Sequence, residues 1–457
     1  MRDLAFAGLL VSLLAIAAAR PFVGVLLWSW ISFMSPHREV FGFAQTMPWA
    51  MMTFLVTVFG CIIAREPRKP AINGVTVLLL VFAVLITLTS LTGIGPPEPR
   101  WYMYDRVIKI LAGLLLTASL LTDRRRIDAL VWLMVIALGY YGVKGGLFTL
   151  ATGGKYIVMG PLDSMIEDRN HLAVGLLVIL PIMNYLRMHA RHRIVRQGLV
   201  FAMVTTLLSV VGSQSRGALL GLIATAGVFW LRSRGKVVSG IAVVIGLAVA
   251  IAFMPDSWVE RMQTIKSYDE DESAMGRITM WIAAFDFARM RPLVGGGFRA
   301  IYDQGIVNLV SPGTFARATH SIWLEVMADH GFPTFFVWLG VIGYGMWYTR
   351  RIARLAKGRE DLRWAFDLAR MTQVATVAYM AGGSFLSLSY WDFFWTLMVV
   401  TGAVHALVLQ AVRQPAPGTV AGAVPGALPA WRAQPAGAQQ PAGARAAAGL
   451  GAATNRA

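Results

Sequence analysis

Three residues carry side chains suited to chemistry on a phosphorylated substrate. Arg216 follows Ser-Gln-Ser between two apolar stretches, Arg277 opens an amphipathic run, and His320 precedes a late apolar stretch. A guanidinium can donate two parallel hydrogen bonds to a phosphate. An imidazole, with an ordinary pKa of about 6.5, can remove a proton from a hydroxyl. Together these groups indicate binding of a phosphate or diphosphate and proton removal beside it.

Each of the three residues also has an ordinary structural interpretation. Arg216 either binds a ligand headgroup or extends to lipid phosphate at the membrane surface. Arg277 either binds a ligand or lies solvated on the polar face of a helix. His320 is either a general base or a structural histidine, and His330 is a weaker competitor for the role of base. His37 and His171 also fall in or beside loops on the same predicted side.

Two further motifs allow alternative chemistry. The run Gly295–Gly297 either lets backbone approach a ligand closely or makes a turn. Asp269 and Asp271 form an Asp-x-Asp motif, which either holds a divalent cation or belongs to a solvated acidic loop; we favour the loop. The sequence has no zinc-binding His-x-x-x-His helix, no cysteine pair and no glycine-rich lysine loop, so zinc hydrolases and P-loop ATPases are excluded.

The composition indicates that these groups belong to a membrane protein. Of 457 residues, 56% are hydrophobic and 14% are charged, and the mean hydropathy is +0.60. Soluble domains carry about 25% charged residues. The chain has 41 Lys and Arg against 24 Asp and Glu, a net charge of +17. In a soluble protein this excess would suggest nucleic acid, but here we expect it to set membrane topology and predict no nucleic-acid partner.

The apolar stretches predict an all-α polytopic fold of about twelve transmembrane helices, because a helical span needs about 20 residues. Arg20 and Pro21 interrupt the first stretch, which is either one kinked helix or two short helices. The predicted spans are Leu4–Met34, Pro48–Ala64, Val75–Ile94, Val107–Leu121, Ala129–Gly142, Leu172–Leu186, Leu199–Val211, Leu219–Leu231, Val237–Met254, Phe332–Tyr348, Met371–Leu388 and Phe393–Val412.

Five basic clusters fall in alternate loops, as the positive-inside rule requires for loops that face the cytoplasm. They lie near residues 65–69, 124–126, 187–196, 232–236 and 350–363. The other loops, near 35–47, 95–106, 143–171, 212–218, 255–331 and 391–392, are then predicted to face outward.

The outward segments and the tail predict four regions. Residues 1–254 are N-terminal transmembrane helices, 255–331 a periplasmic loop domain, 332–412 C-terminal transmembrane helices, and 413–457 a disordered Ala/Gly/Pro-rich cytoplasmic tail. In the loop domain, Ile278, Trp281, Ile282 and Phe285 follow the spacing of an amphipathic helix.

Over residues 1–412 the chain resembles the O-antigen ligase/polymerase superfamily of bacterial inner-membrane glycosyltransferases. The resemblance is carried by Ser215-Arg216-Gly217, by Arg277 with the downstream Pro292, Gly295 and Gly297, and by His320 with Gly331. The beginning of the chain, through the run Met34–Arg38, is similar to the branch of O-glycosylation ligases associated with exosortase.

The resemblance implies an inverting ligase that acts at the periplasmic face of the inner membrane, without metal or cofactor. The donor would be an undecaprenyl diphosphate-linked glycan, and the acceptor a hydroxyl of a lipid A-core sugar, both held in membrane lipid. Arg216 and Arg277 would bind the donor diphosphate, and His320 would be the catalytic base. Asp168, Asn170 and Ser215 are possible substrate contacts.

Three alternatives to this ligase stay open. An O-antigen polymerase or a protein O-glycosylation ligase would use the same donor. A transporter of polyprenyl-linked glycans would bind similar lipids without chemistry. Ion-coupled transporters usually need charged groups inside their spans, and Lys109 is among the few found here, so the sequence favours an enzyme.

Overall fold

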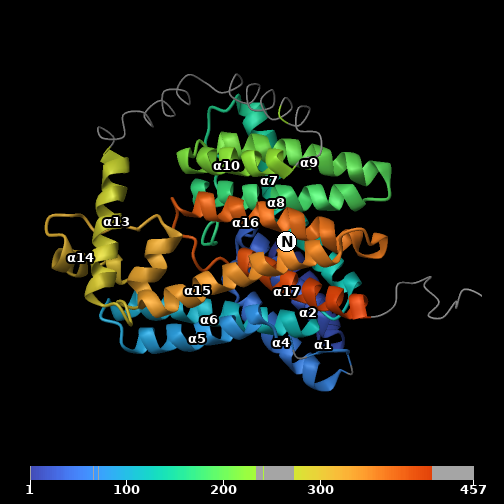
Figure 1. Cartoon of the computed structure of the whole chain (residues 1–457), viewed down its shortest axis with the longest axis horizontal. Coiled ribbons are helices and arrows are strands. Elements are labelled where there is room, and N and C mark those ends of the chain that lie inside the picture. Colours follow the sequence, from blue (N-terminus) through green and yellow to red (C-terminus); the bar gives the residue numbers. More distant parts are fainter. Residues whose placement is uncertain (1, 65, 70, 233–239, 241–271, 414–457) are drawn as a thin grey trace, which may run out of the picture. The chain divides into compact units, whose positions relative to one another are not determined.

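The computed structural model describes residues 2–64, 66–69, 71–232, 240 and 272–413 (Figure 1). All regular elements of this described part are helices, which confirms the predicted all-α class. They are α1 (Arg2–Ala19), α2 (Pro21–Met34), η1 (Pro36–Glu39), α3 (Phe43–Thr46), α4 (Trp49–Ile63), α5 (Gly74–Leu91), α6 (Pro97–Leu120), α7 (Arg124–Thr152), α8 (Arg169–His189), α9 (Arg193–Gly212), α10 (Arg216–Arg232), α13 (Glu272–Met290), η2 (Ala300–Tyr302), α14 (Gln304–Val310), α15 (Ile322–Leu355), η3 (Glu360–Leu362), α16 (Arg363–Gly383) and α17 (Asp392–Arg413).

Seven of the described helices are long and apolar enough to cross a membrane: α1, α5, α7, α8, α9, α15 and α17. Three shorter apolar helices, α2, α4 and α10, accompany them. The protein is therefore a multi-pass membrane protein. The predicted span Val237–Met254 and the tail 414–457 lie outside the described residues, so the count of twelve spans stays a prediction.

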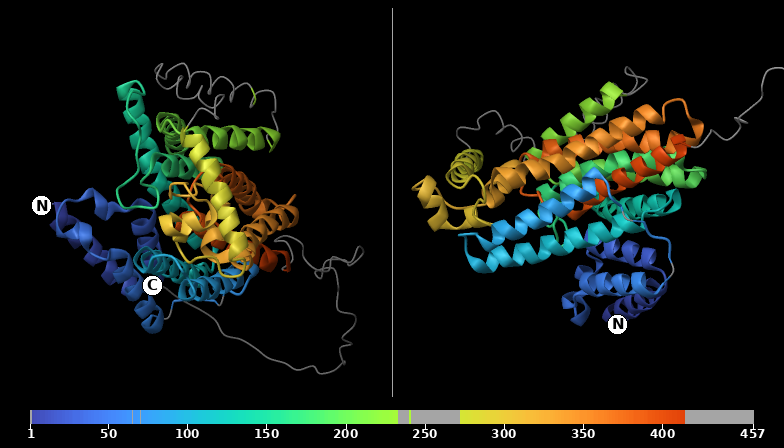
Figure 2. Two further views of the ribbon diagram at one scale, coloured as in Figure 1. Left: turned by 90° about the vertical axis from the view of Figure 1, so that its left-hand side faces the viewer. Right: turned by 60° about the horizontal axis from the view of Figure 1, so that its bottom comes forward.

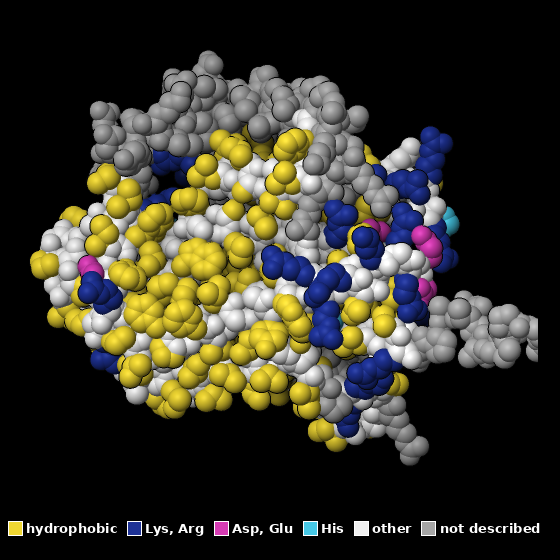
Figure 3. All heavy atoms as spheres, in the orientation of Figure 1, with side chains coloured by type: hydrophobic (Ala, Val, Ile, Leu, Met, Phe, Trp, Pro, Cys, Tyr) yellow, Lys and Arg dark blue, Asp and Glu magenta, His cyan; other side chains and the backbone are white. Residues whose placement is uncertain are grey.

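The surface of the helices carries the pattern expected for contact with lipid. On α5 the exposed side chains Val77, Leu80, Val81, Val84 and Leu88 form an apolar stripe at helical spacing. Figure 3 shows one face of the molecule, on which hydrophobic side chains cover a broad area and Lys and Arg gather toward the right-hand end. The α8–α9 and α15–α16 turns, which carry two of the five basic clusters, lie at that end in Figure 1.

The first apolar stretch forms two helices, α1 and α2, which is one of the two arrangements that the sequence allowed. Arg20 leaves the helical conformation (φ −134°, ψ 86°), and Pro21 starts α2. Proline suits a first helical position because its missing N–H has no acceptor there. The helices α1, α2 and α4 pack together.

Two predicted outward loops contain much more helix than expected. Within the predicted loop 95–106, α6 already begins at Pro97, and within the predicted loop 143–171, α7 continues to Thr152. The extension of α7 packs closely on α9, because a Cβ at Gly146 would lie 2.0 Å from the carbonyl oxygen of Thr205. Small residues allow such close helix contacts. This packing is a tertiary effect that hydropathy does not reveal.

The helix α13 lies across the end of the long helices opposite the basic turns, at the left in Figure 1, and Figure 2 shows it from two further directions. The helix predicted around Trp281 is present, but its buried face is different from the predicted one. Ile282 and Phe285 are exposed, whereas a neighbouring face enters an apolar cluster with α14 and the start of α15. The cluster consists of Met280, Ala284, Phe287, Ala300, Ile301, Ile306, Val307 and Ala328.

The long helix α15 is broken near the boundary predicted between the loop domain and the next span. Gly331 has φ 75° and ψ 179°, values outside the helical region. The N–H of Phe332 donates to the carbonyl of Pro292 (2.8 Å) instead of to the preceding turn, and Pro333 has no N–H. Two carbonyls of the preceding turn therefore lack their helical partners.

The glycine run occupies these two carbonyls. The N–H of Gly296 donates to Ala328 O (3.0 Å), and the N–H of Gly297 donates to Asp329 O (2.8 Å). A Cβ at Gly295 would lie 2.6 Å from Ala328 O, so a side chain there would disrupt the contact. The run thus approaches helical backbone closely and uses its amides for that purpose. We call Gly295–Gly297 with the break at Gly331 the backbone clamp.

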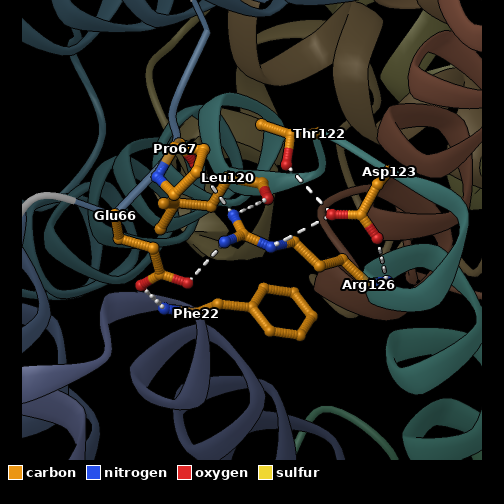
Figure 4. Close-up of polar contacts among 7 residues, drawn as sticks. All are labelled: Phe22, Glu66, Pro67, Leu120, Thr122, Asp123 and Arg126. Atoms are coloured by element: carbon orange, nitrogen blue, oxygen red, sulfur yellow. Dashed lines mark hydrogen bonds and ion pairs between the residues drawn. The ribbon is translucent and has the colours of Figure 1, made fainter. Parts of the chain in front are cut away.

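One arginine of the basic cluster in the first turn of α7 also stabilises the fold (Figure 4). Arg126 forms an ion pair with Glu66 (2.6 Å) and donates to the carbonyl of Leu120 (2.8 Å). Its guanidinium lies over the ring of Phe22 at 5.1 Å, and the N–H of Phe22 donates to Glu66 (3.0 Å). The side chain of Arg126 is only 13% exposed. It therefore ties the start of α2 to the α6–α7 turn.

Replacing Arg126 with alanine should destabilise the folded protein by about 2 kcal/mol, because hydrogen bonds to charged groups are lost and Glu66 is left half-buried. Thermal unfolding in detergent measures this as a lower Tm. Arg125→Ala is the matched control, because Arg125 directly precedes Arg126 in the chain and its side chain is exposed. Equal Tm values for both variants would contradict the structural role of Arg126.

Candidate active site

The described part of the chain encloses a cavity of about 400 Å³. We call it the central cavity. It is bounded by the α7–α8 loop, the segments around η2 and before α15, and the α16–α17 loop. Its lining residues are Met103, Arg106, Met159, Ser164, Met165, Glu167, Asp168, His171, Arg299, Tyr302, Ala318, His320, Glu325, Ser387, Leu388, Ser389 and Tyr390.

His320 lies in the wall of this cavity, held by its backbone. It adopts a left-handed conformation (φ 47°), and its N–H donates to Ser387 Oγ (3.1 Å). The indole of Trp281 donates to the carbonyl of Thr319 (2.7 Å), which joins the segment to α13. The ring Nδ1 of His320 is buried and makes no hydrogen bond with the described residues. One imidazole nitrogen is thus held in place without a protein partner.

The surroundings of His320 keep its ring neutral. Burial is the largest cause, followed by the charges of Arg277 and His171, and together they lower the pKa of His320 to about 4. The imidazole therefore has an available lone pair at neutral pH. The charge of Arg277 thus acts on His320 although the two residues are 43 positions apart in the chain.

Asp168 and Asn170 have a clear local role. Asp168 is the N-cap of α8, and its carboxylate accepts hydrogen bonds from the backbone N–H (2.8 Å) and the side-chain amide (2.7 Å) of Asn170. Burial would raise the pKa of Asp168, but the hydrogen bonds and charge of His171 and the hydrogen bonds of Asn170 outweigh it, and the pKa is well below its ordinary value. Asp168 lines the central cavity as a carboxylate, whereas Asn170 is not part of the lining and only donates hydrogen bonds to Asp168.

His171 connects this cap to the α16–α17 loop. Its Nε2 lies 3.1 Å from the carbonyl oxygen of Ser387, and its Nδ1 lies 3.5 Å from Asp168 Oδ1. Ser387 also accepts the backbone N–H of His320. One serine of the α16–α17 loop therefore links the histidines from two distant segments.

Arg216 and Ser215 lie at the N-terminus of α10, outside the lining of the central cavity. The hydroxyl of Ser215 accepts the N–H of Ala218 (3.1 Å), as a helix cap does. Gly217 packs against Phe385, and the ring of Phe385 lies 6.1 Å from that of Trp281 on α13. The α16–α17 loop thus joins the segments of Arg216, Arg277 and His320.

Arg299 is a cavity residue that sequence patterns did not single out. It has φ 58°, its N–H donates to Asp329 Oδ1 (3.0 Å), and its guanidinium lies 5.8 Å from the ring of Tyr302. Tyr390 donates to the other oxygen of Asp329 (2.9 Å). The buried Asp329 thus fixes the backbone from which Arg299 enters the cavity. The sequence could have marked Arg299 as a candidate site residue, because it directly follows the glycine run and Phe298.

The other candidate histidine and the acidic motif lie elsewhere. His330 is completely buried, with Nδ1 2.7 Å from Thr89 Oγ1 and its ring 4.4 Å from that of Phe298. It belongs to the core and is absent from the cavity lining. Asp269 and Asp271 lie outside the described residues. Among those that the structure describes, no group of three His, Cys, Asp or Glu side chains is arranged to hold a metal ion.

Comparison with known families divides the chain into two parts. Residues 201–339, which contain Arg216, Arg277 and His320, match the family model described as O-antigen ligase. This match assigns residues 201–339 to the O-antigen ligase-like superfamily. Residues 1–191 match a family of unknown function (DUF5935). Asp168 and Asn170 lie in this second part.

Comparison with individual proteins adds little to the family match. No curated protein matches the chain in sequence. A chain from a solved structure entitled "Structural coordination of polymerization and crosslinking by a peptidoglycan synthase complex" is similar to it. The identity is 19% and the TM-score 0.36, over 74% of this chain and 96% of that one. A TM-score this low supports no conclusion about fold or function.

The pKa of His320 should be about 4 in the free protein and should rise in Arg277→Gln, since that variant removes a nearby positive charge. In the unfolded chain the pKa of this histidine is about 6.5, so the unfolded chain binds the proton more tightly than the folded protein does. His320 should therefore lower the free energy of unfolding as the pH drops from about 6.5 to about 4. NMR titration of labelled histidine rings, with His320→Asn for assignment, measures the pKa. The control Arg289→Gln removes an exposed arginine of the same helix and should leave the pKa of His320 unchanged. A His320 pKa near 6.5 in the unaltered protein would contradict the burial of this side chain and the effect of the Arg277 charge on it.

Proposed function

We propose that the protein is an inverting glycosyltransferase of the O-antigen ligase type. It would transfer a glycan from undecaprenyl diphosphate to a lipid A-core sugar hydroxyl at the periplasmic face of the inner membrane. The observation that carries this proposal is the neutral, half-buried His320 in the wall of the central cavity, whose pKa is lowered by burial and by the charge of Arg277. Family membership supports glycosyl transfer of the ligase or polymerase kind.

In this mechanism His320 is the general base. Its unpaired ring nitrogen takes the proton of the acceptor hydroxyl while that oxygen attacks the anomeric carbon of the donor sugar. The bond between the anomeric carbon and the diphosphate oxygen breaks on the opposite face, so the configuration inverts. Undecaprenyl diphosphate leaves with the bonding electron pair.

Arg216 and Arg277 would stabilise the negative charge that develops on the departing diphosphate. Arg277 has a second effect, through His320. In the free protein its charge helps to lower the pKa of the imidazole. A bound diphosphate would offset that charge and raise the pKa toward its ordinary value, which makes His320 a stronger base when donor is present. The base would thus be activated by the substrate itself.

His320→Asn should reduce transfer by about 10²–10⁴-fold, the usual contribution of a general base. Asparagine is the informative replacement because it tolerates the positive φ of this position. Arg277→Gln and Arg216→Gln should each cost about 10²–10³-fold through loss of charge stabilisation. The assay uses purified protein in nanodiscs with lipid-linked glycan and lipid A-core, and it follows ligated product by mass.

His192→Asn and Arg289→Gln, which change exposed residues away from the cavity, are the controls and should retain full activity. Normal transfer by folded His320→Asn protein would refute the base assignment. Product that forms only on a second lipid-linked glycan would identify a polymerase, and product only on protein would identify a protein ligase. Movement of donor across vesicles that survives His320→Asn would identify a transporter.

The proposed chemistry needs no metal, because the arginines supply the positive charge at the diphosphate. We therefore expect the initial rate of transfer to be unchanged after dialysis against EDTA. A rate that is lost in EDTA and restored by added magnesium would contradict the proposal. It would return attention to Asp269 and Asp271.

A further inference from the structure

A second cavity, of about 300 Å³, adjoins the central one. The two share Arg106 and Met165 in their walls, so Arg106 on α6 stands at their border. We call this second space the lateral cavity. Besides these two residues, its walls contain Trp28, Ser32, Ser35, His37 and Tyr102 and a set of charged side chains.

The charges in the lateral cavity cancel. Arg38 pairs with Asp163 (3.1 Å), and Lys109 pairs with Asp105 (2.6 Å). The remaining cation, Arg106, lies near the remaining carboxylate, Asp392, which accepts a hydrogen bond from Ser32. Three cations thus face three carboxylates. A site of this kind does not select an anion, in contrast to the arginine-rich surroundings of His320.

The same walls are rich in groups that bind hydroxyls. Burial, followed by the charge of Arg38, lowers the pKa of His37 to about 4, so the ring is neutral at pH 7, and its buried Nδ1 has no hydrogen-bond partner among the described residues. Arg106 makes no hydrogen bond or ion pair with any residue that the structure describes. Ser32 and Ser35 add hydroxyls, and the carboxylates of the ion pairs retain lone pairs for further donors.

Two aromatic side chains complete this lining. Trp28 is almost fully buried on α2, and Tyr102 is 60% exposed on α6. Flat aromatic faces offer an apolar surface with a polar edge, which suits the C–H face of a sugar ring, whose hydroxyls project sideways. Paired charges, unpartnered donors and acceptors and aromatic faces together match an uncharged, hydroxyl-rich ligand.

We propose that the lateral cavity is a carbohydrate-binding subsite that holds a sugar beside His320, with Arg106 hydrogen-bonded to that sugar at the border of the two cavities. The carbohydrate chemistry follows from the lining, and only the source of the sugar, donor glycan or acceptor, rests on the proposed function. Every lining residue except Asp392 lies within residues 1–191. The subsite thus gives a role to the part that matches a family of unknown function.

Protection of a single thiol tests binding without requiring activity. In a Cys61→Ala background, Tyr102→Cys places a thiol in the lateral cavity. Tyr156→Cys is the matched control, because Tyr156 is also 60% exposed but lines neither cavity. Labelling by a membrane-impermeant maleimide is timed with lipid-linked glycan donor, with lipid A-core oligosaccharide, and with undecaprenyl diphosphate that carries no sugar.

At a glycan concentration of about ten times its Kd, binding should slow labelling at position 102 about tenfold and leave the labelling rate at position 156 unchanged. Protection by donor alone would place the donor glycan in the subsite, and protection by oligosaccharide alone would place the acceptor there; both support the proposal. Equal labelling with and without both glycans would overturn it. Protection by undecaprenyl diphosphate without sugar would also overturn it, in favour of a lipid phosphate site.

A kinetic measurement then separates sugar binding from chemistry. Asp163→Asn removes the ion pair with Arg38. Asparagine tolerates the positive φ of 55° at position 163, so the backbone should not change. For the glycan that protects position 102, this variant should raise KM about tenfold more than it lowers kcat, which corresponds to about 1.4 kcal/mol. The control Arg289→Gln should change neither KM nor kcat. A fall in kcat alone would overturn the binding role. Thiol protection in a protein that transfers no glycan would refute the proposed function and leave the subsite standing.

Discussion

The site depends on an exchange of backbone hydrogen bonds where α15 breaks. A helix interrupted at Gly331 and Pro333 leaves two carbonyls without donors, and unpaired buried backbone groups are costly. The amides of Gly296 and Gly297 satisfy these carbonyls, so the glycine run and the first turns of α15 form one unit. Arg299 follows the run directly, and His320 lies just before the same turns. The backbone clamp therefore sets the position of two cavity side chains at once.

The electrostatic character of the site arises from segments that meet only in the folded chain. Arg277 on α13 and His171 on α8 both lower the pKa of His320, and burial does most of this. Ser387, in the loop between α16 and α17, holds the backbone of His320 and contacts His171. The result is a neutral imidazole in positive surroundings, next to a cavity whose charges are paired. Anionic and uncharged parts of one substrate would find separate surroundings a short distance apart.

Much of the helical framework could be predicted from the sequence, because burial in lipid requires long apolar helices that hydropathy detects. The errors have specific physical causes. The helices α6 and α7 extend into predicted loops, since proline can start a helix and small residues let α7 pack on α9. On α13 the apolar side chains lie on several sides, so periodicity alone could not determine the buried face. The division into four regions was not tested by these features and stays a prediction.

Composition and residue types were enough to indicate the class of protein and its expected chemistry: an apolar helical chain with arginines and a histidine between its spans. Residue type fixes what a side chain can donate, accept or titrate, and hydropathy fixes which segments enter a membrane. The folded arrangement was needed to establish that His320, and not His330, faces a cavity, and that Arg299 and Arg106 line the same cavity. These relations depend on contacts between segments far apart in the chain, such as the glycine run and α15, and no local pattern encodes them.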